Sequence, residues 1–195
     1  MQLHFRTATT EDVPQLKALI ESAFRAQDTR PGWIDNLGLS NTFTIATEEL
    51  ITVLAKADSE MLLAFSAEHT TASTTTTTTT NTSTNTNTET PLIGSVGVSK
   101  RPGNIGRLSL LAVNPMYAAD GIGRQILEYG EEYCIHAWGV EKLSLNTLSV
   151  RLQLRAWYAR RGYVETGETV PFPMKRVPGL VLPDGIHMVE FEKGV

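Results

Sequence analysis

Residues 108–125 read LSLLAVNPMYAADGIGRQ, and this stretch decides how the rest of the chain is interpreted. Its first six residues form a nearly continuous apolar run, which is typical of a strand covered on both faces. Asn114-Pro115 ends the run, and Gly121-Ile122-Gly123 opens a segment whose apolar residues keep helical spacing as far as Trp138. The stretch therefore predicts a buried strand, a short loop and a long helix, which Gly139 ends.

The two glycines at the start of this helix favour a phosphate site. The first turn of a helix leaves its amide N–H groups unpaired, and the helix dipole adds partial positive charge there. Gly121 and Gly123 have no side chains to keep a phosphate away from those amides, so a pyrophosphate could bind without a lysine or arginine. The same glycines would also suit a simple tight turn between strand and helix. This motif alone leaves both interpretations open.

Two other phosphate-binding motifs are excluded. A Walker loop requires Gly-Lys-Ser/Thr, which does not follow the glycines. A dinucleotide-binding fold would need a third glycine where Ile126 stands, and an acidic residue at the end of the next strand, where the chain has Leu145-Asn146.

The flanking segments predict an α/β fold, with an α+β mixed sheet flanked by helices. We expect strands at residues 3–7, 61–68, 92–98, 108–113 and 142–146, one beginning at 163, and one at 186–192. We expect helices after a cap at Thr9 and at residues 47–56, 121–138 and 150–161. The alternation of strands and helices over 107–168 indicates a crossover unit, to which an antiparallel N-terminal half is joined. Residues 1–195 are expected to form one domain.

A threonine-rich tract, TTASTTTTTTTNTSTNTNTET at residues 70–90, interrupts the expected hairpin between strands 61–68 and 92–98. It contains no large apolar residue, so we expect a disordered insertion. Closing the longer loop costs only about 1.5 kcal/mol, because the entropy penalty grows logarithmically with length. An O-glycosylated or adhesive segment and a harmless repeat expansion both fit, and the loop position favours the second.

Composition narrows the function classes. The chain has 195 residues, 41% of them apolar, with a net charge of −4 and a pI near 5.6, so no basic field indicates nucleic acid. One cysteine, Cys134, fits a reducing compartment, and the scattered histidines predict no metal site. No signal sequence or membrane span is found. We therefore expect a cytoplasmic protein, with the nucleus left open, that binds neither nucleic acid nor membrane.

A second motif, RLQLRAWYARRGY at residues 151–163, adds a specific resemblance. Together with the first, it makes residues 111–168 resemble the acetyl-CoA core of the GNAT superfamily of N-acetyltransferases. The opening FRTATTEDVPQLKALIESAF is similar to the first strand and helix of that family. The pairing of Leu-x-Val and Gly-x-Gly with a later Trp-Tyr-x-x-Arg-Gly-Tyr is far more specific than either half.

The resemblance implies a cosubstrate, acetyl-CoA, and roles for matching positions. Backbone groups of Leu111, Ala112 and Val113 would bind the pantetheine arm, and the sheet would splay at this strand to admit the thioester. Tyr158 would donate a proton to the departing CoA thiolate, since a phenol with a pKa near 10 is a plausible acid. The main-chain amides around the pyrophosphate would come from Ala119, Asp120, Gly121, Ile122, Gly123 and Arg124.

Three departures from the family pattern bear on cofactor affinity. Ala118 stands where the family usually has glutamine or arginine, and Asp120 places an anion beside the phosphates. Arg151 replaces an asparagine often found seven residues before the tyrosine, so Asn146 or the backbone alone would recognise pantetheine. Each lost contact costs about 1–2 kcal/mol, whereas several aligned amides remain, so binding is expected to survive in weakened form.

Several side chains have two interpretations. Arg155, Arg160 and Arg161 would reach the 3′-phosphate of CoA or remain solvated, and Cys134 fits core packing better than nucleophilic chemistry. Glu165 or Glu168 could act as general base, or both could be ordinary exposed acids. Residues 166–173 and 27–35 are expected to form the walls of the acceptor pocket.

The predicted function is transfer of an acetyl group from acetyl-CoA to a primary amine, with a small molecule favoured as acceptor. A homodimer is left open, and no metal is expected. One alternative is a CoA-binding sensor or catalytically silent domain, and another is a protein or peptide N-acetyltransferase.

Overall fold

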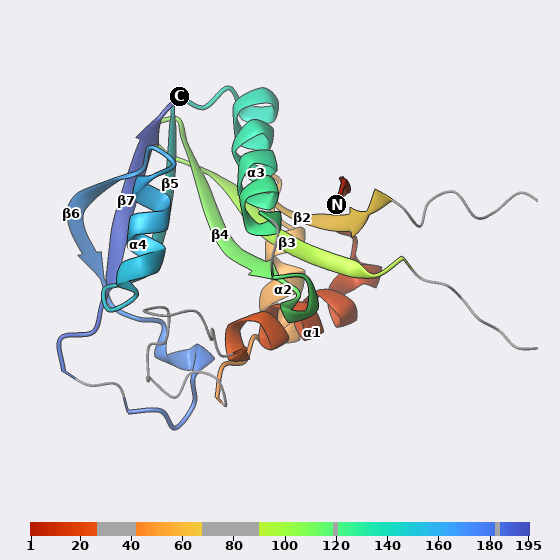
Figure 1. Ribbon diagram of the computed structural model, residues 1–195, viewed down its shortest axis with the longest axis horizontal. Helices are drawn as coiled ribbons and strands as arrows, with labels where there is room; N and C mark the ends of the chain where they lie inside the picture. The colour runs from red at the N-terminus through yellow and green to blue at the C-terminus, as the bar shows by residue number, and fades with distance from the viewer. Residues whose placement is uncertain (27–41, 68–89, 119–120, 182–183) are drawn as a thin grey trace, which may run out of the picture.

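The strand predicted from residues 108–125 is the central strand of a seven-stranded mixed sheet, and the predicted helix packs on one face of that sheet (Figure 1). The computed structural model describes residues 1–26, 42–67, 90–118, 121–181 and 184–195. Its strands are β1 (Leu3–Thr7), β2 (Ser59–Ser66), β3 (Leu92–Arg101), β4 (Ile105–Val113), β5 (Lys142–Leu148), β6 (Val164–Val170) and β7 (Met188–Gly194). Its helices are α1 (Val13–Arg25), α2 (Thr47–Leu54), α3 (Ile122–Trp138) and α4 (Leu152–Ala159), with short 3₁₀ turns η1 (Thr10–Asp12), η4 (Pro115–Tyr117) and η5 (Met174–Arg176).

The strand order is β1-β2-β3-β4-β5-β7-β6. Strands β4 and β5 run parallel and α3 connects them, as the crossover pattern predicts; every other pair is antiparallel. The C-terminal strand β7 inserts between β5 and β6, so these two strands are parallel but not adjacent. Residues 70–89 of the threonine-rich tract and the predicted pocket wall at 27–35 lie outside the described residues.

The sheet carries a hydrophobic core on each face. Helices α3 and α4 cover one face, and α1 and α2 cover the other (Figure 1). Alternate residues of β2 enter different cores: Leu62 lies beneath α3, whereas Leu63 packs with α1 and α2. Gly130 lets α3 lie close to the sheet, because a Cβ there would be 3.1 Å from side-chain atoms of both Leu108 and Val96.

Strands β4 and β5 are paired over only three positions, from Ile105↔Lys142 to Arg107↔Ser144. From Leu108 onward β4 remains paired with β3, while β5 continues along β7. The two parallel strands therefore diverge, and the splay expected at this strand is present.

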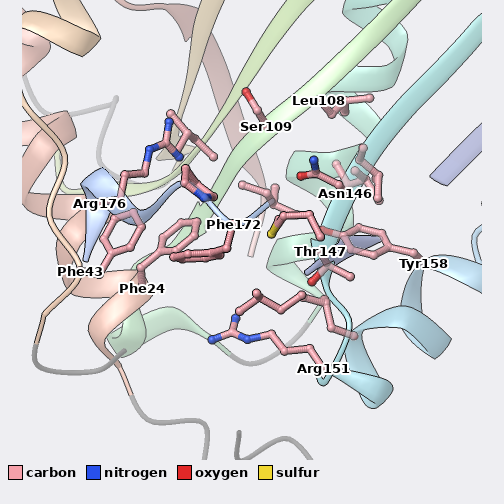
Figure 2. Close-up of a pocket in the computed structure, with 18 residues that line it drawn as sticks. Phe24, Phe43, Leu108, Ser109, Asn146, Thr147, Arg151, Tyr158, Phe172 and Arg176 are labelled. Atoms are coloured by element: carbon pink, nitrogen blue, oxygen red, sulfur yellow. The ribbon is translucent and has the colours of Figure 1, made fainter. Parts of the chain in front are cut away.

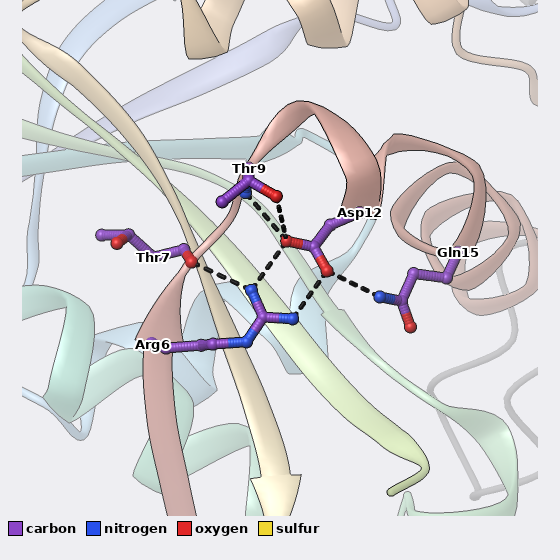
Figure 3. Close-up of polar contacts among 5 residues, drawn as sticks. All are labelled: Arg6, Thr7, Thr9, Asp12 and Gln15. Atoms are coloured by element: carbon purple, nitrogen blue, oxygen red, sulfur yellow. Dashed lines mark hydrogen bonds and ion pairs between the residues drawn. The ribbon is translucent and has the colours of Figure 1, made fainter. Parts of the chain in front are cut away.

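The start of α1 is fixed by a carboxylate at its N-cap, Asp12 (Figure 3). Asp12 is 4% exposed, and its oxygens accept from the Arg6 guanidinium at 2.6 and 2.7 Å. The same carboxylate accepts from the Thr9 amide at 2.8 Å and from the Gln15 amide group at 2.7 Å. Thr9 is the N-cap residue of η1, as the sequence pattern indicated, and it forms a capping box with Asp12.

No helix in the described parts of the chain is both long enough and apolar enough to cross a bilayer.

Candidate active site

A cavity of about 190 Å³ occupies the gap where β4 and β5 diverge (Figure 2). Residues 108–111 of β4 and 145–148 of β5 form its two sides, and Arg151, Leu154 and Tyr158 reach it from the α4 segment. At the other end Phe24, Phe43, Phe172 and Arg176 gather, opposite Asn146 and Tyr158. A hollow between two parallel strands that have separated can admit an extended ligand alongside their free edges.

The edge of β4 facing this gap carries unpaired backbone groups. Asn114 donates its amide to Ile93 O at 2.8 Å, so this residue faces β3. Because strand residues alternate in direction, Ala112 also turns its backbone groups toward β3, whereas those of Leu111 and Val113 point toward the gap. Of the three residues expected to bind pantetheine, Leu111 and Val113 therefore present backbone groups there, and Ala112 does not.

A β-bulge bends β4 at the cavity. Two of its residues, Leu110 and Leu111, lie opposite the single residue Val96 of β3, and Leu110 has a φ of 48°. A positive φ costs a non-glycine residue about 1–2 kcal/mol. Bulges and such strained conformations concentrate at functional sites, where they redirect backbone and side chains. Both residues of the bulge line the cavity.

The first turn of α3 has unpaired amides, as a phosphate site requires. Arg124 donates its amide N–H to Gly121 O at 3.0 Å, whereas those of Ile122 and Gly123 have no acceptor among the described residues. Gly121 has a φ of 76°, and a Cβ built there would meet nothing within 4 Å. The amides of Ile122 and Gly123 are thus open to a ligand, and that of Arg124 is already used. The other two expected pyrophosphate contacts, Ala119 and Asp120, lie outside the described residues.

Cations of α3 and α4 lie near this helix start. Arg161 packs over the Trp157 ring, 3.6 Å from its centroid, and donates to Trp157 O at 2.8 Å. Burial lowers the pKa of Arg161, and the neighbouring charges of Arg160 and Arg124 lower it further. Nε of Arg161 is buried without a partner among the described residues. These three guanidinium groups are suited to an anion, and Glu128, which pairs with Arg124 at 3.4 Å, offsets part of their charge.

Asn146 is held at the cavity by a buried ion pair. Its Nδ2 donates to Glu190 Oε1 at 2.6 Å, and Glu190 also accepts two hydrogen bonds from Arg107 of β4. The side chains of Arg107 and Glu190 are 6% and 13% exposed. The network joins β4, β5 and β7 near the start of the splay and uses one of the two Asn146 amide hydrogens, so the Asn146 oxygen and its second hydrogen are left to contact a ligand.

Tyr158 lies in the gap, and its hydroxyl has no hydrogen-bond partner among the described residues. The residue is 6% exposed and packs edge-on against Trp157 and Tyr163. Burial raises the pKa of Tyr158 to about 12, although the nearby charges of Arg151, Arg161 and Arg107 act in the opposite direction. The phenol therefore stays protonated at neutral pH and has a proton available for a ligand.

The structure also bears on four other sequence hypotheses. Glu165 pairs with Arg155 at 2.8 Å outside the cavity, and Glu168 is exposed on β6, so neither expected base lies in the gap. The pairing also diverts Arg155 from a phosphate role. Cys134 is fully buried, and burial raises the pKa of its thiol to about 12, which suits packing. Of the predicted wall 166–173, only Phe172 and Pro173 line the cavity; residues 166–170 belong to exposed β6.

Sequence reasoning missed Phe24, Phe43 and Arg176 as cavity residues. Phe43 and Arg176 come from segments without a motif, and the Thr44 amide joins those segments by donating to Arg176 O at 2.7 Å. Among the described residues, no three metal-binding side chains cluster.

The fold is a seven-stranded mixed sheet that splays between its two parallel strands over a cavity. The model of the acetyltransferase (GNAT) family matches residues 50–163, which is more than half of the chain. The chain therefore belongs to the GNAT acetyltransferase family, as the resemblance implied.

Solved structures share the fold at low identity. PaiA N-acetyltransferase from Thermoplasma acidophilum, in complex with coenzyme A, matches with a TM-score of 0.64 and 16% identity over all of both chains. An IAA acetyltransferase from Bacillus cereus matches with 0.62 and 13%, also over all of both chains. A spermidine N-acetyltransferase chimera from Vibrio cholerae and hSSAT matches with 0.63 and 12%, over 100% of this chain and 96% of that one. No curated protein sequence matches.

Proposed function

We propose that the protein transfers an acetyl group from acetyl-CoA to a primary amine of a small molecule by direct attack. The observation that carries this proposal is the cavity in the β4–β5 splay, which Tyr158 and the bulged edge of β4 line together. The family supplies the reaction class, and the low-identity structures add only the fold.

In this proposal the cofactor lies extended in the gap. The pantetheine arm would lie along β4, hydrogen-bonded to outward-facing backbone groups of Leu111 and Val113, as an added strand would be. The pyrophosphate would meet the amides of Ile122 and Gly123. The cluster of Arg124, Arg160 and Arg161 supports placing the phosphates at the same end of the gap.

The chemistry requires one new bond and one broken bond. The amine nitrogen attacks the thioester carbonyl carbon, a C–N bond forms, and the C–S bond breaks to release a thiolate. A backbone N–H from the bulged part of β4 would polarise the carbonyl oxygen. The Tyr158 hydroxyl would protonate the thiolate and regain its proton from solvent, while the amine gives its proton to water.

The rival function is a CoA-binding sensor without turnover. It is favoured by one observation: no carboxylate is among the cavity-lining residues in the described segments, so no side-chain base is evident there. The reaction can proceed without a side-chain base if a fraction of the acceptor amine is already neutral when it binds, because water can then take the proton released after attack. The enzyme proposal therefore predicts a rate that rises with pH as the amine loses its proton.

Two measurements test the proposal together. Calorimetry with acetyl-CoA reports binding, and a thiol-release assay over small amines and peptides reports turnover. Binding with turnover on small amines supports the proposal, and turnover confined to peptides would replace the small-molecule acceptor with a protein. Binding without turnover on any amine would favour the sensor, and absence of binding would contradict both functions.

A further inference from the structure

The acceptor end of the cavity has an unusual combination of side chains. Phe24, Phe43 and Phe172 surround it with apolar surface, and Arg176 lies beside them (Figure 2). The lining residues in the described parts of the chain include two arginines, Arg151 and Arg176, and no acidic residue. The space is therefore apolar with positive charge, which suits an anion and an apolar group and disfavours a polycation.

The guanidinium of Arg176 is held in place with part of its donor capacity unused. Its Nη2 donates to Glu49 Oε1 of α2 at 2.5 Å, and its main-chain oxygen accepts from Thr44. Its Nε is buried and has no partner among the described residues. A buried donor without a partner costs about 1–3 kcal/mol, so the protein does not fully satisfy this guanidinium.

Glu49 does not cancel the positive charge at this site. Its carboxylate is shared between Arg176 and Lys175, whose Nζ lies 3.5 Å from Oε2, so two cations surround one anion. Burial alone would raise the pKa of Glu49, but the ion pairs with Arg176 and Lys175 outweigh it and leave the pKa below its ordinary value. The trio therefore carries one net positive charge at neutral pH.

We propose that the acceptor is an apolar primary amine that also carries a carboxylate, as an amino acid with an aromatic or aliphatic side chain does. The carboxylate binds Arg176, and the apolar group lies among Phe24, Phe43 and Phe172. The proposal rests on the acetyl-transfer function and narrows its substrate class. The proposal also predicts that spermidine is a poor acceptor. Its several positive charges would lie beside Arg176 and the phenylalanines, and none of the described cavity residues offers a carboxylate to pair with them.

Matched pairs of amines test the carboxylate directly. The pairs are L-phenylalanine with phenethylamine, L-tryptophan with tryptamine, and L-leucine with 3-methylbutylamine, with spermidine as a polycation. Because a hydrogen bond to a charged group contributes about 1.5–3 kcal/mol, at least one carboxylated member should exceed its decarboxylated partner roughly 10- to 100-fold in kcat/KM. Turnover in which decarboxylated amines or spermidine equal or exceed every carboxylated partner would overturn this inference and leave acetyl transfer standing.

Two variants assign the preference to Arg176. Arg176→Gln should raise KM for the carboxylated amine by the same factor, with little change in KM for its decarboxylated partner or for acetyl-CoA. Glu49→Gln breaks the same ion pair but keeps the guanidinium, so it should retain the preference; melting temperatures of both variants show whether they fold. Equal loss on both members of a pair would contradict a carboxylate site.

If no amine is turned over, that result counts against the proposed function. A binding measurement still tests the carboxylate site in that case. Calorimetry of the CoA-loaded protein with the three amino acids should then show binding of at least one that Arg176→Gln abolishes. Failure of all three to bind would overturn the carboxylate site.

Discussion

Removing the hydroxyl of Tyr158 should reduce catalysis without affecting the stability of the fold. Because this hydroxyl has no partner among the described residues, Tyr158→Phe should leave the melting temperature nearly unchanged. The variant should lose about 100-fold in kcat, since a general acid typically contributes 10²–10⁴-fold. KM for acetyl-CoA should change little. Steady-state thiol release and a thermal melt check these three outcomes.

Tyr163 provides the matched control. Its hydroxyl is buried and donates to Glu131 Oε1 at 2.9 Å, and Lys193 pairs with the same carboxylate at 2.7 Å. Tyr163→Phe should therefore destabilise the fold by about 1 kcal/mol and leave kcat within a few-fold of the original. If the two variants lost activity equally, Tyr158 would have a packing role in place of the proposed acid role.

Gly123 tests the phosphate site, because stability and binding should change in opposite directions. The residue lies in the first turn of α3, and a Cβ there would make an ordinary 3.6 Å contact with Val113. Gly123→Ala should stabilise the helix by up to about 1 kcal/mol. It should also raise KM for acetyl-CoA about tenfold, because the methyl group obstructs the adjacent amides.

S-acetylpantetheine, which lacks the pyrophosphate, is the control for this variant. Its KM should be the same for the original protein and for Gly123→Ala. An unchanged KM for acetyl-CoA would instead mean that the glycine only permits a tight turn, which is the alternative that the sequence leaves open.

At the scale of elements, the β1–α1 junction makes stability depend on pH. Hydrogen bonding to Arg6 is the main factor that holds the pKa of Asp12 well below its ordinary value, against a smaller opposing effect of burial. A carboxyl with a lowered folded-state pKa stabilises fully above its unfolded pKa, and this contribution is lost as pH falls. Since an unfolded aspartate has a pKa of about 3.9, the contribution of Asp12 is complete above about pH 5 and declines below pH 4.

Asp12→Asn isolates this contribution. It should lower the free energy of unfolding by about 2 kcal/mol at pH 7, because it removes a charged partner from Arg6 and the anion from the helix start. Urea denaturation at pH 7 and pH 3 should give a smaller difference between the two proteins at pH 3. A difference that does not depend on pH would contradict the ionic account.

The elements with strong local patterns were predictable from sequence. The apolar run and the helical spacing of residues 108–138 require only nearby residues, and both β4 and α3 are found there. The insertion of β7 between β5 and β6 depends on β5–β7 pairing between residues far apart in sequence, as in Asn146↔Glu190, and has no local signal. The start of β4 at Ile105 was also missed, because Gly106 and Arg107 interrupt the apolar run.

The candidate site divides in the same way. Tyr158 and the glycines of α3 lie in recognisable motifs, so their positions beside the gap could be expected. Arg176 and Phe43 reach the cavity only because distant segments pack together. The sequence pattern does not show that Glu165, a candidate base, is paired with Arg155. A sequence pattern shows which groups are present, but the partners that neutralise them depend on the tertiary structure.

At the scale of the whole molecule, all seven strands belong to one sheet. That sheet is continuous across its middle only through the three residue pairs that join β4 to β5. A ligand lying in the gap would contact both halves of the sheet. CoA at a hundredfold excess over its Kd should therefore raise the free energy of unfolding by about 2.7 kcal/mol, and the melting temperature should rise with it. A thermal melt with and without CoA measures this shift.

The splay also creates two strand edges inside the sheet. Beyond Arg107 and Ser144, β4 and β5 have backbone groups with no strand beside them, although neither is an outer strand. Unpaired edges can recruit strands from other chains, and proteins usually cover or charge them. In this fold the pantetheine arm would serve as that cover, so the same molecule that brings the acetyl group would also protect the sheet from aggregation.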